Sequence, residues 1–370
     1  MLNALSTTQL ASLSATGIGS LGASVMAALS TSQLDVLTAT QLSGLTSTQT
    51  QSMSAAQLAS LNNTQLAALS TNGINGLTSS QIAALNSTQL SAFGATAMAA
   101  LSADAISGLS GTALKNLTTT QFQSMSPTGI AGLTTTQLAA LTTAQVTLLT
   151  STSLSGLTAT QVAALTPAQF ETLTATQLGA LSSNGITGLT ASQLADMTTT
   201  QLGGLSATQI SALTTTEIDA LSTTQIAALT TTQLAGLDRM QLRSLSTEQV
   251  TALTTTQVAS LGTAQVSSLT GTELQSLLPA QFAALNATQV GAFTSTQLGT
   301  MTQTQIAALA ANQLTGLTTT TISALSATTI SYLTTTEIEA LNAAQIDAFS
   351  TTQLAGMTSA QLAAVLRAVA

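Results

Sequence analysis

An eight-residue repeat runs through the chain without a change of register from Leu5 to Val365. Its first position is apolar in all 46 occurrences, and its sixth position is apolar in 44 of 45, with Thr50 as the exception. The consensus reads Leu-Ser/Thr-x-x-Gln-Leu-x-small, as in residues 229–236. A globular enzyme interrupts its core pattern with loops and a site, whereas this pattern has no interruption. The repeat therefore constrains the architecture strongly and says little about a partner or a substrate.

Neither a single long helix nor a single long strand accommodates this octad. Eight residues turn an α-helix through about 800°, so an apolar stripe would drift by roughly 80° per repeat and form no fixed face. In a strand, the first and sixth positions are an odd number of residues apart and would point to opposite faces. The repeat therefore requires a change of direction within each octad.

The polar positions of the octad match the start of a short helix. Ser, Thr, Asn, Asp or Gly occupies the second position in 43 of 45 octads, with Leu278 and Ala310 as exceptions, and these residues are preferred at helix N-caps. Gln or Glu follows three residues later in 34 octads, which completes a capping box, and the flanking leucines are placed as a hydrophobic staple. All three prolines lie at the third position, which is the first helical residue and tolerates proline well: Pro127, Pro167 and Pro279.

The octad therefore predicts an all-α fold, a solenoid or superhelix of short capped helices of about six or seven residues each, with one helix per repeat. One octad buries only two leucine-class side chains, so its stability must come from stacking on neighbouring repeats. We expect a single continuous solenoid across residues 1–370, with 45 octads from Leu5 to Ala364. The abundance of threonine, which favours strands, supports a β-solenoid as the alternative.

A second period of seven octads, a 56-residue super-repeat, is superimposed on the first. Glycine followed by isoleucine occupies the fifth and sixth positions at Gly17, Gly73, Gly129 and Gly185. The interval indicates the duplication of a seven-octad segment, one or two superhelical turns, or both. Because glycine lacks the side chain of the capping box, we expect these octads to mark a closer contact or a bend.

The composition excludes several classes of function. Charged residues make up 4% of the chain, the net charge is −8, and the four Lys and Arg residues form no basic patch, so we expect no nucleic-acid partner. No apolar run is long enough to span a membrane, and the first residues lack the basic region of a cleavable signal peptide. The absence of cysteine excludes disulfides.

The residues that usually carry catalysis are scarce. The chain has no histidine, which excludes His-based triads and the usual zinc sites. The pairs Glu217/Asp219 and Glu337/Glu339 are two residues apart and would not face each other on a helix. Neither an EF-hand loop nor the nonapeptide of calcium β-rolls occurs. We therefore expect no enzymatic activity, no cofactor and no metal site.

Three side chains stand out from the uniform surface. Arg239 and Arg243 lie four residues apart in the one strongly charged octad, so they share a helix face and are candidates for binding an anion or an acidic neighbour. Tyr332 is the single tyrosine. These three residues are the candidate surface contacts.

The core pattern continues close to both ends of the sequence, and polar capping repeats, which are usual in soluble solenoids, are not evident. Uncapped ends would expose apolar surface that head-to-tail assembly would cover. The candidate residues for such assembly ends are Leu2, Leu5, Leu362, Val365 and Leu366.

Segments such as Leu221-Ser-Thr-Thr-Gln-Ile-Ala-Ala-Leu229 resemble the Leu-Thr-Thr-Thr-Gln-Leu-Ala-Ala-Leu octad arrays of large secreted or surface proteins of proteobacteria. The resemblance covers essentially the whole chain. Those arrays look like stalks or spacers in adhesin-like proteins, so the resemblance implies an extracellular or cell-surface location.

We therefore expect a structural, non-catalytic repeat protein. It would be an extracellular filament or sheath subunit, or a surface stalk, that associates end to end with itself, with cell-surface components as further candidate partners. The alternative is an adhesin-like binding module that recognises a peptide or glycan along the groove of the solenoid. A third hypothesis is ice or mineral binding by rows of threonine at the fourth position.

Overall fold

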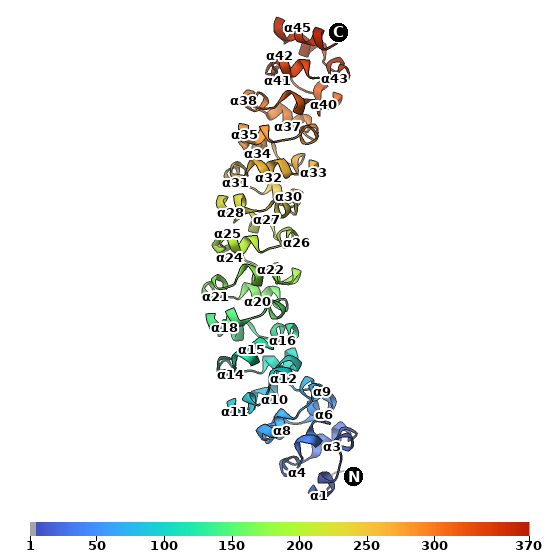
Figure 1. The fold of residues 1–370 in the computed structure, drawn as a ribbon, viewed down its shortest axis with the longest axis vertical. Coiled ribbons are helices and arrows are strands. Elements are labelled where there is room, and N and C mark those ends of the chain that lie inside the picture. The colour runs from blue at the N-terminus through green and yellow to red at the C-terminus, as the bar shows by residue number, and fades with distance from the viewer. Residues whose placement is uncertain (1–4, 370) are drawn as a thin grey trace. The chain divides into compact units, whose positions relative to one another are not determined.

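The computed structural model describes residues 5–369, and within this range it contains 45 α-helices and no strand (Figure 1). The all-α solenoid prediction is therefore confirmed, and the β-solenoid alternative is wrong. The chain divides into two compact units, residues 1–189 and 190–370, and each is described by itself. The continuity of one solenoid across residues 1–370 stays a prediction.

Unit 1 contains the first 23 helices. Their bounds are α1 (Thr7–Ala11), α2 (Ala15–Gly19), α3 (Ala23–Ala28), α4 (Thr31–Asp35), α5 (Ala39–Leu42), α6 (Ser47–Ser52), α7 (Ala55–Ala59), α8 (Asn63–Ala67), α9 (Thr71–Asn75), α10 (Ser79–Ala83), α11 (Ser87–Ser91), α12 (Ala95–Ala100), α13 (Ala103–Ser107), α14 (Gly111–Asn116), α15 (Thr119–Gln123), α16 (Pro127–Ala131), α17 (Thr135–Ala139), α18 (Thr143–Leu148), α19 (Ser151–Leu154), α20 (Ala159–Ala163), α21 (Pro167–Glu171), α22 (Ala175–Gly179) and α23 (Ser183–Ile186).

Unit 2 contains the remaining helices that the structure describes. Their bounds are α24 (Ala191–Asp196), α25 (Thr199–Gly203), α26 (Ala207–Ser211), α27 (Thr215–Asp219), α28 (Thr223–Ala228), α29 (Thr231–Ala235), α30 (Arg239–Arg243), α31 (Thr247–Ala252), α32 (Thr255–Ser260), α33 (Thr263–Val266), α34 (Gly271–Ser276), α35 (Pro279–Ala283), α36 (Ala287–Gly291), α37 (Ser295–Thr300), α38 (Gln303–Ile306), α39 (Ala311–Leu314), α40 (Thr319–Ser323), α41 (Ala327–Ser331), α42 (Thr335–Glu339), α43 (Ala343–Asp347), α44 (Thr351–Ala355) and α45 (Ser359–Ala368).

Each helix begins at the third position of its octad, as the capping pattern predicts. In α29, Thr230 has extended backbone angles (φ −67°, ψ 157°) and its hydroxyl accepts a hydrogen bond from the Gln233 N–H at 3.1 Å. The Gln233 Oε1 atom accepts from the Thr230 N–H at 2.9 Å, so the capping box is complete. At Leu278 and Ala310, which have no cap oxygen, the following glutamine still accepts from the cap N–H. The three prolines each lie at the first helical residue.

The helices are shorter than predicted. They span four to six residues, apart from the ten-residue α45, so the expected length of six or seven residues is wrong for most of them. In α29 the eighth position, Gly236, serves as the C-cap. The N–H of the next first-position residue, Leu237, then bonds to the Leu234 carbonyl at 3.1 Å. This i→i+3 hydrogen bond closes the last turn of the helix, and the chain then continues to the N-cap of the next helix.

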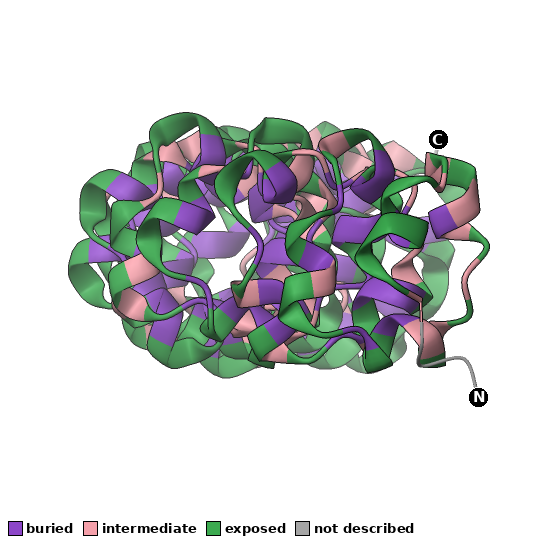
Figure 2. Cartoon of the chain, turned by 90° about the horizontal axis from the view of Figure 1, so that it is seen from below, coloured by how far each residue is buried: buried purple, intermediate pink, exposed green. Residues whose placement is uncertain are grey.

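The first and sixth positions form the core, with buried residues on the inner side of the short helices and exposed residues outside (Figure 2). Leu234 at the sixth position is 0% exposed, and Leu237 at the next first position is 3% exposed. The single polar residue of this series, Thr50, is also fully buried. Its hydroxyl donates to the Gly73 carbonyl at 2.7 Å, which satisfies the one break in the apolar pattern.

Within each unit, successive turns of the superhelix stack with an offset of half an octad. Helix α29 packs on α26, while Gln233 of α29 donates to carbonyls of Leu202 in α25 and of Leu205, which lies between α25 and α26. Each helix thus lies over the junction of two helices in the preceding turn. The distance along the chain from Leu205 to Gln233 is 28 residues, or three and a half octads, so we assign this length to one superhelical turn.

This turn length explains the seven-octad period, because seven octads make two turns and restore the octad register. In unit 1 the glycine–isoleucine octads therefore recur at every second turn. A Cβ atom on Gly73 would lie 3.3 Å from the Leu45 carbonyl, and one on Gly185 would lie 2.9 Å from the Leu157 carbonyl, in both cases one turn earlier. Gly73 and Gly185 therefore mark the closer contact that the sequence suggested, whereas Gly17 and Gly129 do not, since a Cβ atom on either would have only ordinary contacts at 3.4 Å or more.

Candidate functional site

The most extensive polar feature is a ladder of buried glutamines at the fifth position of the octads. In most members of this glutamine ladder, Nε2 donates to backbone carbonyls in the preceding turn. Gln257 is 2% exposed, and its Nε2 lies 2.8 Å from the carbonyl oxygens of both Ile226 and Leu229. Its Oε1 accepts from the Thr254 N–H at 2.7 Å. Both donors and the acceptor of the carboxamide are therefore used.

The ladder satisfies carbonyl groups that the short helices leave without partners. The Ile226 carbonyl already accepts the Leu229 N–H at 3.2 Å, but the Leu229 carbonyl lies beyond the end of α28 and depends on Gln257. A buried carbonyl without a donor would cost about 1–3 kcal/mol. Within residues 5–369, no side-chain nitrogen or oxygen that is sealed from solvent lacks a hydrogen-bond partner. The glutamines thus connect the cap of one helix to the backbone of the preceding turn.

Sequence reasoning assigned these glutamines only to local capping boxes and missed the contact between turns. One signal was present: 31 of the 34 capping-box residues are glutamine and three are glutamate. A capping box works with either residue, whereas only glutamine also supplies N–H donors. The strong bias therefore indicates that the amide donors are used.

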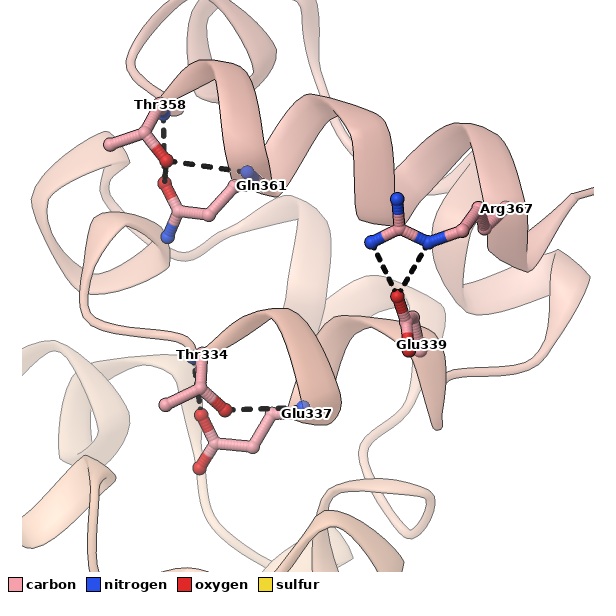
Figure 3. Close-up of polar contacts among 6 residues, drawn as sticks. All are labelled: Thr334, Glu337, Glu339, Thr358, Gln361 and Arg367. Atoms are coloured by element: carbon pink, nitrogen blue, oxygen red, sulfur yellow. Dashed lines mark hydrogen bonds and ion pairs between the residues drawn. The ribbon is translucent and has the colours of Figure 1, made fainter.

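Glu337 lies at the fifth position of its octad, where most octads have a ladder glutamine (Figure 3). Its side chain has no N–H groups to donate to the preceding turn. Its Oε2 accepts from the Thr334 N–H at 2.6 Å, and its other oxygen points in the same direction as Nε2 of Gln361 in α45 (Figure 3). Glu339, two residues away, instead pairs with Arg367 at 2.6 Å. The two carboxylates therefore have separate surroundings and separate roles.

The structure places Arg239 and Arg243 of α30 together on the rim of an open groove of about 650 Å³ in unit 2. The groove is also lined by the segment Ser267–Gly271, which precedes and begins α34, and by Thr294 and Thr296 at the start of α37. Tyr332 does not line this groove; it is the half-buried C-cap of α41. The three candidate surface residues therefore do not form one site.

One carboxylate of unit 2 has a pKa below its ordinary value. The pKa of Glu248 in α31 is lowered, mainly because its carboxylate accepts a backbone hydrogen bond and also accepts from the hydroxyls of Ser246 and Thr247. Glu248 therefore loses its proton at a lower pH than an unperturbed glutamate does.

The candidate assembly residues have mixed exposure. Leu5 and Val365 are half-buried, whereas Leu362 and Leu366 are 38% and 68% exposed. Leu2 lies outside the described residues. The structure gives the exposure of the other four side chains, and the role of all five in assembly stays a prediction.

No helix within residues 5–369 is long and apolar enough to cross a membrane. No group of three or more acidic side chains there is arranged to hold a metal ion.

Residues 51–87, 114–151 and 234–271 each match the family model of the ALTTAQ repeat. Each of the three matched segments spans between four and five octads, and together they cover about a third of the chain. No curated protein sequence matches the chain. The similarity to a known repeat family over these segments supports a structural repeat protein.

Proposed function

We propose that this protein is a non-catalytic spacer whose stacked turns extend a surface stalk or filament, and that its turns also stack on those of a second copy. The glutamine ladder carries this proposal, because it joins successive turns by the same kind of contact. Such an array gains length turn by turn without requiring new chemistry. An extracellular or cell-surface location is part of the proposal and is supported by the resemblance to surface repeat arrays.

The first and last described turns offer complementary hydrogen-bonding groups. Gln9 in the first turn uses its Oε1 atom on the Ser6 N–H, and its Nε2 has no acceptor among residues 5–369. In the last turn, the position that would supply a ladder donor to the Leu341 carbonyl is Val369, which has no side-chain N–H. A further turn from a second copy would continue the ladder with these groups, and the exposed Leu366 side chain would be covered at the same contact.

The test is electron microscopy together with sedimentation velocity of the full chain across a concentration series. We expect particles that lengthen with concentration and have a regular axial repeat. Leu366→Ser should raise the concentration needed for association by about 10-fold, since it removes apolar surface that the contact buries. Val36→Ser is the matched control, because Val36 is also exposed (38%) but is the C-cap of α4, which already stacks on the turn before it through Gln33 and Leu5, and it should leave association unchanged. Monomers alone at the highest concentration would contradict self-association.

A further inference from the structure

The helix α30 brings two cations together, and their charges are not neutralised within the described residues. Arg239 and Arg243 are exposed and form no ion pair with any residue between 5 and 369. Arg367, by contrast, pairs with Glu339 at 2.6 Å. The chain has a net charge of −8, so two guanidinium groups without ionic partners make this part of its surface locally positive.

The carboxylate of the same octad does not pair with these arginines because the backbone holds it. Asp238 is the N-cap of α30, and its Oδ1 accepts from the N–H groups of Met240 at 2.7 Å and Gln241 at 2.8 Å. Charge-assisted hydrogen bonds of this kind hold the carboxylate at the backbone. The octad thus carries its own acidic residue, yet leaves both guanidinium groups without an ionic partner.

The stacking of turns places a hydroxyl-rich surface beside these charges. The groove crosses three successive turns, with the arginines on the first, Ser267, Ser268 and Thr270 on the second, and Thr294 and Thr296 on the third. Met240, which is 65% exposed, adds an apolar surface at the same edge. A groove of similar size in unit 1, along Leu61–Thr64 and Asn86–Gln89, is lined by no charged residue.

We propose that the α30 groove, defined by Arg239, Arg243, Ser267, Ser268, Thr270 and Thr294, binds an acidic polysaccharide. The guanidinium groups would each donate in a fork to a carboxylate of the polymer. The hydroxyls of Ser267 and Ser268 donate their protons to the Ala264 and Gln265 carbonyls, so their oxygens are left to accept from sugar hydroxyls. An open groove across stacked turns suits an extended polymer, and two positive charges on an acidic chain are too few for a nucleic acid. The proposal is independent of self-association, because none of these residues belongs to the glutamine ladder.

The experiment is isothermal titration of the full chain with oligomers of polygalacturonate, which carry a carboxylate on each sugar. We expect weak binding that falls as the salt concentration rises. The double variant Arg239→Ala/Arg243→Ala should weaken binding by about 10-fold or more, and each single variant by about 3- to 5-fold. Lys115→Ala is the matched control, since Lys115 is an exposed cation of α14 in unit 1, and it should bind like the original chain.

Two further ligands decide what is recognised. The fully methyl-esterified polymer has the same sugars without charge and should not bind. Poly-glutamate has the charge without sugars and should bind at least about 10-fold more weakly than polygalacturonate. Equal binding of poly-glutamate would overturn the polysaccharide assignment. Unchanged affinity in the double arginine variant, with the circular dichroism spectrum intact, or no binding of polygalacturonate at low salt, would overturn the site.

Discussion

Replacing Gln257 with alanine is expected to lower the free energy of unfolding by about 3–5 kcal/mol. The change removes the hydrogen bonds from Nε2 to the Ile226 and Leu229 carbonyls and the one that Oε1 accepts from the Thr254 N–H. The Leu229 carbonyl then loses its donor in a buried position, and the missing side chain leaves a cavity between two turns. A surface residue of the same helix would have no such effect.

Urea denaturation followed by circular dichroism, with hydrogen exchange of the amides in α28 and α32, measures this loss. Thr256→Ala is the matched control, because Thr256 is exposed one residue away, and it should change stability by no more than about 0.5 kcal/mol. Gln257→Glu should fall between the two, since it keeps the acceptor for Thr254 and loses the donors. A Gln257→Ala variant as stable as Thr256→Ala would show that the ladder contributes nothing between turns.

The double variant Glu273→Gln/Glu337→Gln is expected to be more stable than the original chain by about 2–4 kcal/mol. Both glutamates are buried, at 4% and 5% exposed, and each accepts from its cap N–H through Oε2. A carboxyl group has no N–H to offer to the carbonyls one turn earlier, Leu245 and Leu309. Glutamine has the same shape and would supply both missing donors without additional side-chain entropy cost.

The two sites lie more than two turns apart, so the two single variants should each contribute about 1–2 kcal/mol and add in the double variant. Thermal and urea denaturation at pH 7 measure the gain. Glu248→Gln is the control for a reduced net charge, since it removes one exposed carboxylate from the same unit, and it should not reproduce the gain. Destabilisation by either ladder substitution would mean that the glutamates have a favourable partner outside the ladder.

The sequence predicts the local structure of this fold well because each octad specifies its own helix. Ser, Thr or Asn at the second position and Gln at the fifth define the start of most helices through contacts that are local in the chain. The apolar first and sixth positions then identify the core. These features need no knowledge of neighbouring turns, which is why the cap, the helix start and the buried leucines could be read directly.

The arrangement of the turns could not be derived in the same way. The turn length depends on where the Gln257 amide meets the Ile226 and Leu229 carbonyls, and backbone carbonyls have no signature in the sequence. The groove beside Arg239 and Arg243 could not be predicted either, because it is formed by segments of different turns that come together only when the turns stack. The seven-octad period is two turns long, but only the contacts between turns, such as those of Gln257, give the length of a turn.

Oxidative cross-linking of a cysteine pair tests the turn of three and a half octads most directly, because the chain has no cysteine of its own. A Cβ atom on Gly111 would lie 3.7 Å from the Cβ atom of Ala140, which is one turn and one residue later in the chain, and this separation is usual in a disulfide. Gly111→Cys/Ala140→Cys should therefore cross-link almost completely under mild oxidation, as judged by non-reducing electrophoresis and mass spectrometry. Gly111→Cys/Leu148→Cys, one octad out of register, should stay reduced. Preferential cross-linking of the pair at 148 would contradict a turn of three and a half octads, and with it the glutamine ladder that depends on this register.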